Sequence, residues 1–170
     1  TLDAVKEGDR LPELPVQVTA TTVILGALAS RDWRPMHHDR DFAINRNGTR
    51  DIFMNTPNLA AWFERYITDW TGPHGRIGKM KFRMRDSIFP GDTMVFRGSV
   101  QKVGTDDAGC GWTDLHVTVS VGDKTCTECN ARGGPFRRAL PAWRGRDRWA
   151  RSRERISRGQ ATARRDRARQ

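Results

Sequence analysis

The sequence predicts an α+β fold in which an antiparallel β-sheet wraps around one long central helix, followed by a basic tail. Residues 56–70 place apolar side chains on one helical face, and several later segments alternate apolar and polar side chains as strands do. The tail is recognised by charge. Residues 131–170 contain 14 arginines and three acidic residues, whereas residues 1–130 contain 16 basic and 17 acidic residues. The net charge of +10 therefore belongs to the tail.

This charge distribution divides the chain into a predicted domain, residues 1–131, and an Arg-rich tail, residues 132–170. The tail has few aliphatic side chains, so it cannot bury enough apolar surface to offset the entropy of ordering. We therefore predict that the tail is disordered. The alternative is an arm that binds RNA or a membrane through Trp143 and Trp149. Because residues 1–130 are nearly neutral, nucleic acid is not an expected partner.

The cysteines and the hydropathy favour a cytoplasmic protein with reduced thiols. Cys110, Cys126 and Cys129 are odd in number and form no pattern typical of secreted domains. No signal peptide is recognised, and no apolar segment approaches the roughly 18–20 residues of a membrane span. Cys126 and Cys129 have C-x-x-C spacing without a second ligand pair, and their odd separation predicts opposite faces of a strand. No metal site is predicted.

The first third of the chain is expected to contain short elements. Residues 1–14 are irregular, residues 15–22 alternate as a strand does, and residues 23–30 are typical of a short buried helix. A polar loop follows. Residues 40–47 predict another short helix that ends at Gly48, a residue suited to the position after a helix.

The strongest predicted element is the helix at residues 56–70. Thr56 is the expected N-cap and Pro57 the first helical residue, where a missing N–H costs nothing. The apolar face comprises Leu59, Trp62, Phe63, Tyr66, Ile67 and Trp70, and we expect it to be core. Strands are expected at residues 76–89, 93–103, 112–121 and 124–131.

The loop that follows the first predicted helix carries the candidate chemistry. Asp32 and His37 are five residues apart, with Pro35 between them to stiffen the loop. A carboxylate and an imidazole that share one water can deprotonate it and return a proton to carbon. Hydration of an activated double bond requires both steps. The spacing alone is weak, because many loops contain such residues as turn caps.

The residues around this pair make the prediction more specific. Asp32, Pro35 and His37 match the motif G-D-x-N-P-x-H of the MaoC-like hot-dog hydratases, with Arg31 in place of the glycine and Arg34 in place of the asparagine. The stretches HHDRDFAI, DIFMN and ERYITDWTGP extend the likeness. Over about residues 8–130 the chain resembles this family, most of all the small hot-dog subunits of actinobacterial steroid side-chain enoyl-CoA hydratases.

The resemblance implies a hot-dog fold and reversible, (R)-type hydration of 2-enoyl-CoA thioesters with a steroid-derived or other bulky acyl group. It implies that Asp32 and His37 are catalytic, and that the backbone N–H of Asn55 forms the oxyanion hole at the start of the central helix. No metal or redox cofactor is expected, since the CoA thioester is the substrate. Asn55 could instead serve only as a helix cap.

Two other functions stay open. A hot-dog thioesterase would use a carboxylate on or near the central helix, where Glu64 is the main acidic residue. The chain could also be a non-catalytic, acyl-CoA-binding partner subunit. Asp39 is expected to cap the next helix, and His38 to be its structural neighbour. A sheet with open edges and one covering helix predicts a homodimer or a heteromer with a second hot-dog subunit.

Overall fold

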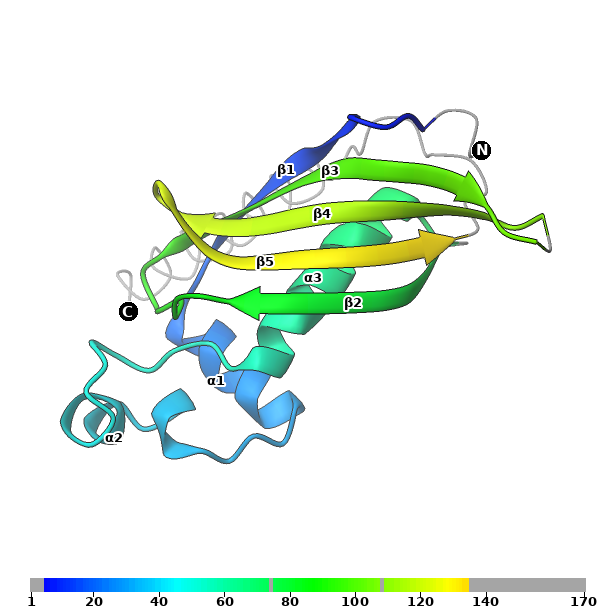
Figure 1. The fold of residues 1–170 in the computed structure, drawn as a ribbon. Helices are drawn as coiled ribbons and strands as arrows, with labels where there is room; N and C mark the ends of the chain where they lie inside the picture. The colour runs from blue at the N-terminus through cyan, green and yellow to red at the C-terminus, as the bar shows by residue number, and fades with distance from the viewer. Residues whose placement is uncertain (1–4, 74, 108, 135–170) are drawn as a thin grey trace, which may run out of the picture. The chain divides into compact units, whose positions relative to one another are not determined.

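The computed structural model describes residues 5–134, except residues 74 and 108. Its sheet has five antiparallel strands in the order β1-β3-β4-β5-β2. The strands are β1 (Arg10–Gln17), β2 (Arg76–Met84), β3 (Thr93–Thr105), β4 (Gly111–Val121) and β5 (Lys124–Gly134). The sheet curves over α3 (Thr56–Thr71), as Figure 1 shows. The predicted α+β hot-dog arrangement is confirmed.

The core lies between α3 and the concave face of the sheet. Phe63 is fully buried and contacts Phe82 of β2 and Phe96 of β3 edge-on, with ring centroids 5.3 and 5.0 Å apart. Tyr66 packs on Phe96 and donates its hydroxyl to the Pro12 carbonyl. The apolar helical face predicted from the sequence is therefore the face that binds the sheet, although Trp62 and Trp70 are only partly buried.

The N-terminal elements begin earlier than predicted. Residues 10–14, expected to be irregular, belong to β1, and α1 (Ala20–Ala29) begins within the predicted strand 15–22. Thr19 explains the early helix start, because it caps α1 and exchanges hydrogen bonds with Thr22 in a capping box. β1 tolerates its prolines because it is an edge strand.

The shorter elements lie together near the N-terminal end of α3 (Figure 1). After α1 come a 3₁₀ turn, η2 (Pro35–His37), and α2 (Arg40–Asn45). Asp39 caps α2 by accepting the Phe42 N–H at 3.0 Å, as predicted. No helix among the described residues is long and apolar enough to cross a membrane.

The C-terminal strand is slightly longer than the predicted one. β5 continues to Gly134, and it pairs with both β2 and β4. The remainder of the predicted tail, residues 135–170, lies outside the described residues.

Candidate active site

Asp32 is positioned by the turn that ends α1. Its backbone N–H donates to the Ala27 carbonyl at 2.9 Å, and the preceding Arg31 adopts the left-handed conformation with φ of 54°. Glycine reaches this region without steric cost, whereas other residues rarely enter it. A glycine at position 31, as in the family motif, would adopt this conformation without steric cost. Arg31 adopts it despite its side chain.

His37 is held at the end of η2 with its ring orientation determined by a backbone contact. The side chain is 6% exposed, and its Nδ1 lies 2.8 Å from the Phe53 carbonyl oxygen. A carbonyl only accepts, so Nδ1 carries a hydrogen and donates it. In the neutral ring, Nε2 then presents its lone pair. The Phe53 ring packs edge-on against the imidazole at 4.8 Å.

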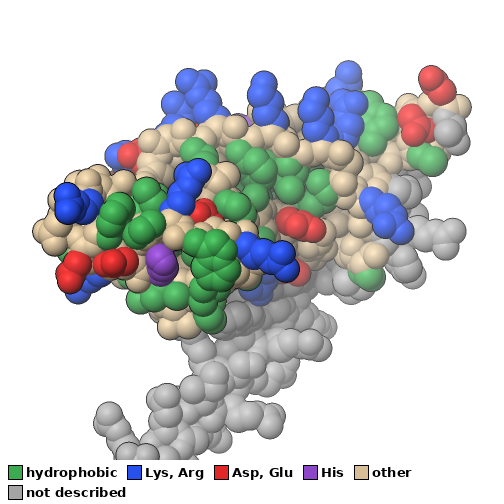
Figure 2. Space-filling view, turned by 90° about the horizontal axis from the view of Figure 1, so that it is seen from below, with side chains coloured by type: hydrophobic (Ala, Val, Ile, Leu, Met, Phe, Trp, Pro, Cys, Tyr) green, Lys and Arg blue, Asp and Glu red, His purple; other side chains and the backbone are tan. Residues whose placement is uncertain are grey.

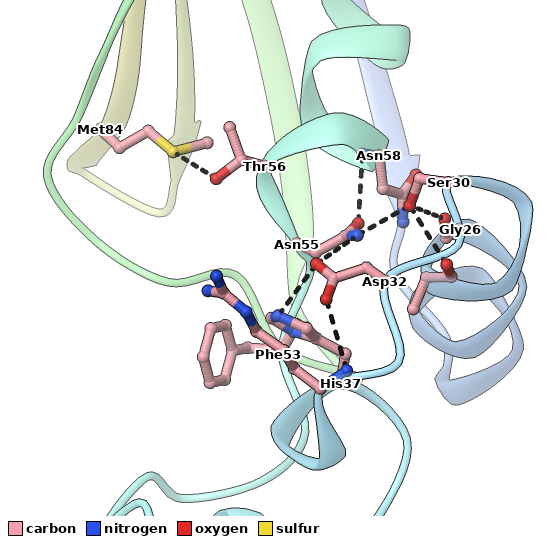
Figure 3. A network of polar contacts seen from close by, with 11 residues as sticks. Gly26, Ser30, Asp32, His37, Phe53, Asn55, Thr56, Asn58 and Met84 are labelled. Atoms are coloured by element: carbon pink, nitrogen blue, oxygen red, sulfur yellow. Dashed lines mark hydrogen bonds and ion pairs between the residues drawn. The ribbon is translucent and has the colours of Figure 1, made fainter.

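The structure brings the two predicted catalytic side chains together. His37 Nε2 lies 3.6 Å from Asp32 Oδ2, as Figure 3 shows. The hydrogen bond from the Asn55 side chain, and to a smaller degree the Arg34 N–H and the charges of His37 and Arg34, hold the pKa of Asp32 below its ordinary value of 3.8, against the opposing effect of burial. Asp32 is therefore a carboxylate at neutral pH, beside a nitrogen that can accept a proton.

Asn55 contributes more to this site than the predicted backbone group. It is the N-cap of α3, and Thr56 is the first helical residue, so the prediction that Thr56 caps the helix was wrong by one position. The Asn55 side chain accepts the Asn58 N–H at 3.1 Å and donates to Asp32 Oδ2 at 2.9 Å. Asparagine is a strong N-cap, but the bond to Asp32 joins residues far apart in sequence, and sequence reasoning missed it.

A cavity of about 650 Å³ opens beside these residues. Asp32, His37 and Asn55 line it together with the first residues of α3, and Arg31 and Arg34 also reach it. Its apolar part is formed by Met36, Phe53, Met54, Leu59, Met84 and Ile88. Figure 2 views the molecule from the side of α1 and α2, where hydrophobic and basic side chains lie next to one another. The cavity thus offers both an apolar wall and a polar reactive end.

Other candidate residues lie outside this site. Glu64 is exposed on α3 and does not line the cavity, and His38 is exposed at the end of η2. Cys126 and Cys129 are both buried, because the β4–β5 pairing shifts by one residue near Cys126 and interrupts the alternation on which the opposite-face prediction relied. Within residues 5–134, residues 74 and 108 excepted, no group of three or more His, Cys, Asp or Glu side chains could hold a metal ion.

Comparison with known proteins identifies relatives in sequence and in fold. No protein-family profile matches the chain. The β subunit of 3-oxo-4,17-pregnadiene-20-carboxyl-CoA hydratase from Mycobacterium tuberculosis is 38% identical over 96 residues, which are 56% of this chain and 74% of that protein. A chain of the ChsH1-ChsH2 complex from the same organism has a TM-score of 0.71 at 30% identity, covering 78% of this chain and 98% of its own length.

More distant structures share the fold. The (R)-hydratase from A. caviae involved in PHA biosynthesis has a TM-score of 0.67 at 19% identity, and covers 81% of this chain and 98% of its own. The MaoC-like dehydratase from Rhodospirillum rubrum has a TM-score of 0.69 at 17% identity, covering 82% and 98%. Because the chain has the hot-dog fold and is 38% identical to a relative of which it covers 74%, it belongs to the MaoC-like family of hot-dog-fold enoyl-CoA hydratases and acyl dehydratases.

Proposed function

We propose that the chain catalyses reversible hydration of a 2-enoyl-CoA thioester with Asp32 and His37 as the catalytic pair. The observation that carries this proposal is the 3.6 Å approach of His37 Nε2 to Asp32 Oδ2 at the wall of the cavity. Two acceptor groups this close can hold one water between them by its two hydrogens. Nδ1 cannot compete for that water, because it is bonded to the Phe53 carbonyl.

In the proposed reaction, the water oxygen bonds to C3 of the enoyl group and a proton is delivered to C2. One member of the pair takes a proton from the water, and the pair returns a proton to carbon. Because the two groups share one water, they titrate as a unit and the base is not assigned to either alone. Addition of water leaves the overall oxidation state unchanged, so the scheme uses no redox cofactor, and both proton transfers are assigned to the Asp32/His37 pair.

The negative charge that develops on the thioester oxygen requires donors. The N-terminus of α3 lines the cavity through Asn55 and Thr56, and a helix N-terminus combines free N–H groups with the positive end of the helix dipole. We assign the oxyanion hole to the Asn55 backbone N–H, for which the described residues provide no hydrogen-bond partner. Loss of one such donor costs about 3 kcal/mol in other enzymes.

The proposed acyl group is bulky and apolar. The cavity volume of about 650 Å³ and the methionine and isoleucine side chains along its wall support this choice. The 38% identical relative is named for a hydratase of a pregnadiene carboxyl-CoA, so we propose a steroid side-chain enoyl-CoA as substrate and (R)-type addition. Turnover of such a thioester and of crotonyl-CoA should be compared. Equal or better use of crotonyl-CoA would contradict the bulky-substrate proposal.

The proposed working unit contains a second hot-dog subunit. Trp33, Leu25 and Leu28 are 65%, 58% and 42% exposed on α1 and the loop beside the site. Exposed apolar side chains of this size are typical of a protein interface. The structurally similar Mycobacterium tuberculosis chain belongs to a two-protein complex. Sedimentation of the chain, alone and co-expressed with hot-dog proteins encoded nearby, distinguishes heteromer from homodimer, and a fully active monomer would contradict both.

The thioesterase alternative has less support. It requires a carboxylate from the central helix at the reacting carbonyl, whereas Glu64 is exposed away from the cavity. Thioester hydrolysis should be assayed beside hydration on the same substrate. Glu64→Gln should leave both rates unchanged, whereas hydrolysis that depends on Glu64 would favour the thioesterase. A non-catalytic partner subunit would be inactive alone, and the activity of its complex would be unchanged by Asp32→Asn or His37→Ala.

A further inference from the structure

The Asn55 side chain has a defined orientation in the wall of the site. Asn55 is only 2% exposed. The Asn58 backbone N–H is a donor and lies 3.1 Å from Oδ1 of Asn55, so the amide oxygen must face it. The amide nitrogen then points the other way, where its two hydrogens meet Ser30 Oγ at 2.8 Å and Asp32 Oδ2 at 2.9 Å. Figure 3 shows Asn55 between these groups.

Ser30 and Asn58 hold the Asn55 side chain in this orientation. Ser30 donates its hydroxyl hydrogen to the Gly26 carbonyl at 2.7 Å, so its oxygen is left to accept from Asn55. The Asn58 side chain donates to the Thr22 carbonyl at 3.0 Å. These bonds connect α1 and its C-cap, Ser30, to the first turn of α3. Asp32 is thus attached through Asn55 to two helices at once.

We propose that the Asn55 side chain is a positioning residue, which holds Oδ2 of Asp32 toward the water shared with His37. This inference rests on the proposed hydratase function. Asn55 makes the shortest contact to the carboxylate, because the Arg34 N–H lies 3.4 Å from Oδ1 and His37 lies 3.6 Å from Oδ2. A glycine at this position would keep the backbone N–H but would have no side chain for this role.

Two substitutions separate the side chain from the backbone donor. Asn55→Gly keeps the N–H and removes the amide, so kcat/KM should fall by about 10- to 100-fold, as loss of one hydrogen bond to a charged group predicts. Since that bond favours the ionised form of Asp32, the acid limb of the pH profile should move to higher pH. Asn55→Asp keeps the helix cap but places a second carboxylate beside Asp32. The acid limb of the pH profile should therefore move to still higher pH.

Asn58→Ala is the matched control, because Asn58 is buried in the same network but does not contact Asp32. It should lower stability and leave the pH profile unchanged. The Asp32 pKa should also be measured by carboxyl ¹³C NMR, with the signal assigned from Asp32→Asn. An Asp32 pKa and pH profile unchanged in Asn55→Gly would overturn the proposal. The NMR titration tests the role of Asn55 even if the protein hydrates no enoyl-CoA. Absence of hydration would instead refute the hydratase function.

Discussion

At the scale of single residues, the site depends on two backbone interactions that are separate from the reacting atoms. The Phe53 carbonyl accepts from Nδ1 of His37, which leaves Nε2 to face Asp32. The left-handed turn at Arg31 directs Asp32 toward the same point. Neither interaction depends on the side chain of Phe53 or Arg31. Substitution of the two reactive side chains should therefore remove chemistry without removing the turn.

Asp32→Asn and His37→Ala should each lower kcat for enoyl-CoA hydration by about 100-fold or more, the range for loss of a general acid or base. The double variant should lose little more than either single variant, because both groups act on one water. Turnover at saturating substrate would measure kcat, and circular dichroism would show whether each variant is folded. Near-normal turnover in either folded variant would refute the assignment.

The lowered pKa of Asp32 also predicts how stability depends on pH. In the unfolded chain the carboxyl titrates near 3.8, and in the folded protein at a lower pH because Asn55 donates to it. The unfolded state therefore binds more protons between these values, so the contribution of Asp32 is present above pH 3.8 and is lost as pH falls through the folded pKa.

Urea unfolding between pH 6 and pH 3 tests this sign. Asp32→Asn should weaken the loss of stability on acidification. Asp114→Asn should do the same, because Arg132 lowers the pKa of Asp114, but it should leave turnover unchanged since Asp114 lies outside the cavity. A steeper loss of stability in Asp32→Asn would contradict the prediction.

At the scale of elements, the junction of α1 and α3 positions the site. Gly26 of α1 has no room for a Cβ, which would overlap the Asn58 side chain. The absence of a side chain at Gly26 lets the Asn58 amide reach the Thr22 carbonyl. The close approach of the two helices thus depends on one glycine, although glycine lowers intrinsic helix stability.

Gly26→Ala should consequently destabilise the protein by about 1–3 kcal/mol, as overpacking does, despite the gain of roughly 1 kcal/mol in helix propensity. Gly78→Ala is the control, because its nearest neighbour is the Arg132 carbonyl oxygen at an ordinary 3.7 Å. Chemical denaturation measures the free energy of unfolding of both variants. A more stable Gly26→Ala variant would show that α1 and α3 separate easily.

At the scale of the whole molecule, the sheet leaves β1 and β2 as edges. An open edge presents unpaired backbone groups to a neighbouring chain. Trp33 is exposed directly after Asp32 in the chain, and Leu25 and Leu28 are exposed on α1. Assembly with a second subunit would therefore affect catalysis as well as stability, which gives the proposed heteromer a functional purpose.

The Arg-rich segment should contribute little to stability or to catalysis. Deletion of residues after 141 is expected to leave the melting temperature and turnover unchanged, since its composition provides no apolar face for packing. Thermal unfolding and the hydratase assay of the truncated chain measure this. A large drop in melting temperature would refute the prediction, whereas loss of polyanion binding alone would favour an arm that binds nucleic acid.

Local patterns in the sequence determined α3, its buried face and the later strands, because periodic apolar side chains report directly on which face is buried. Phe63 is an example, since it lies on the predicted apolar face of α3 and is fully buried. The motif around Asp32 and His37 likewise predicted two side chains that the structure brings to within 3.6 Å of each other. Only the tertiary structure decided that residues 10–14 pair with β3, and that Asn55 binds Asp32. Both are contacts between residues distant in the chain, and such contacts leave no periodic signal in the sequence.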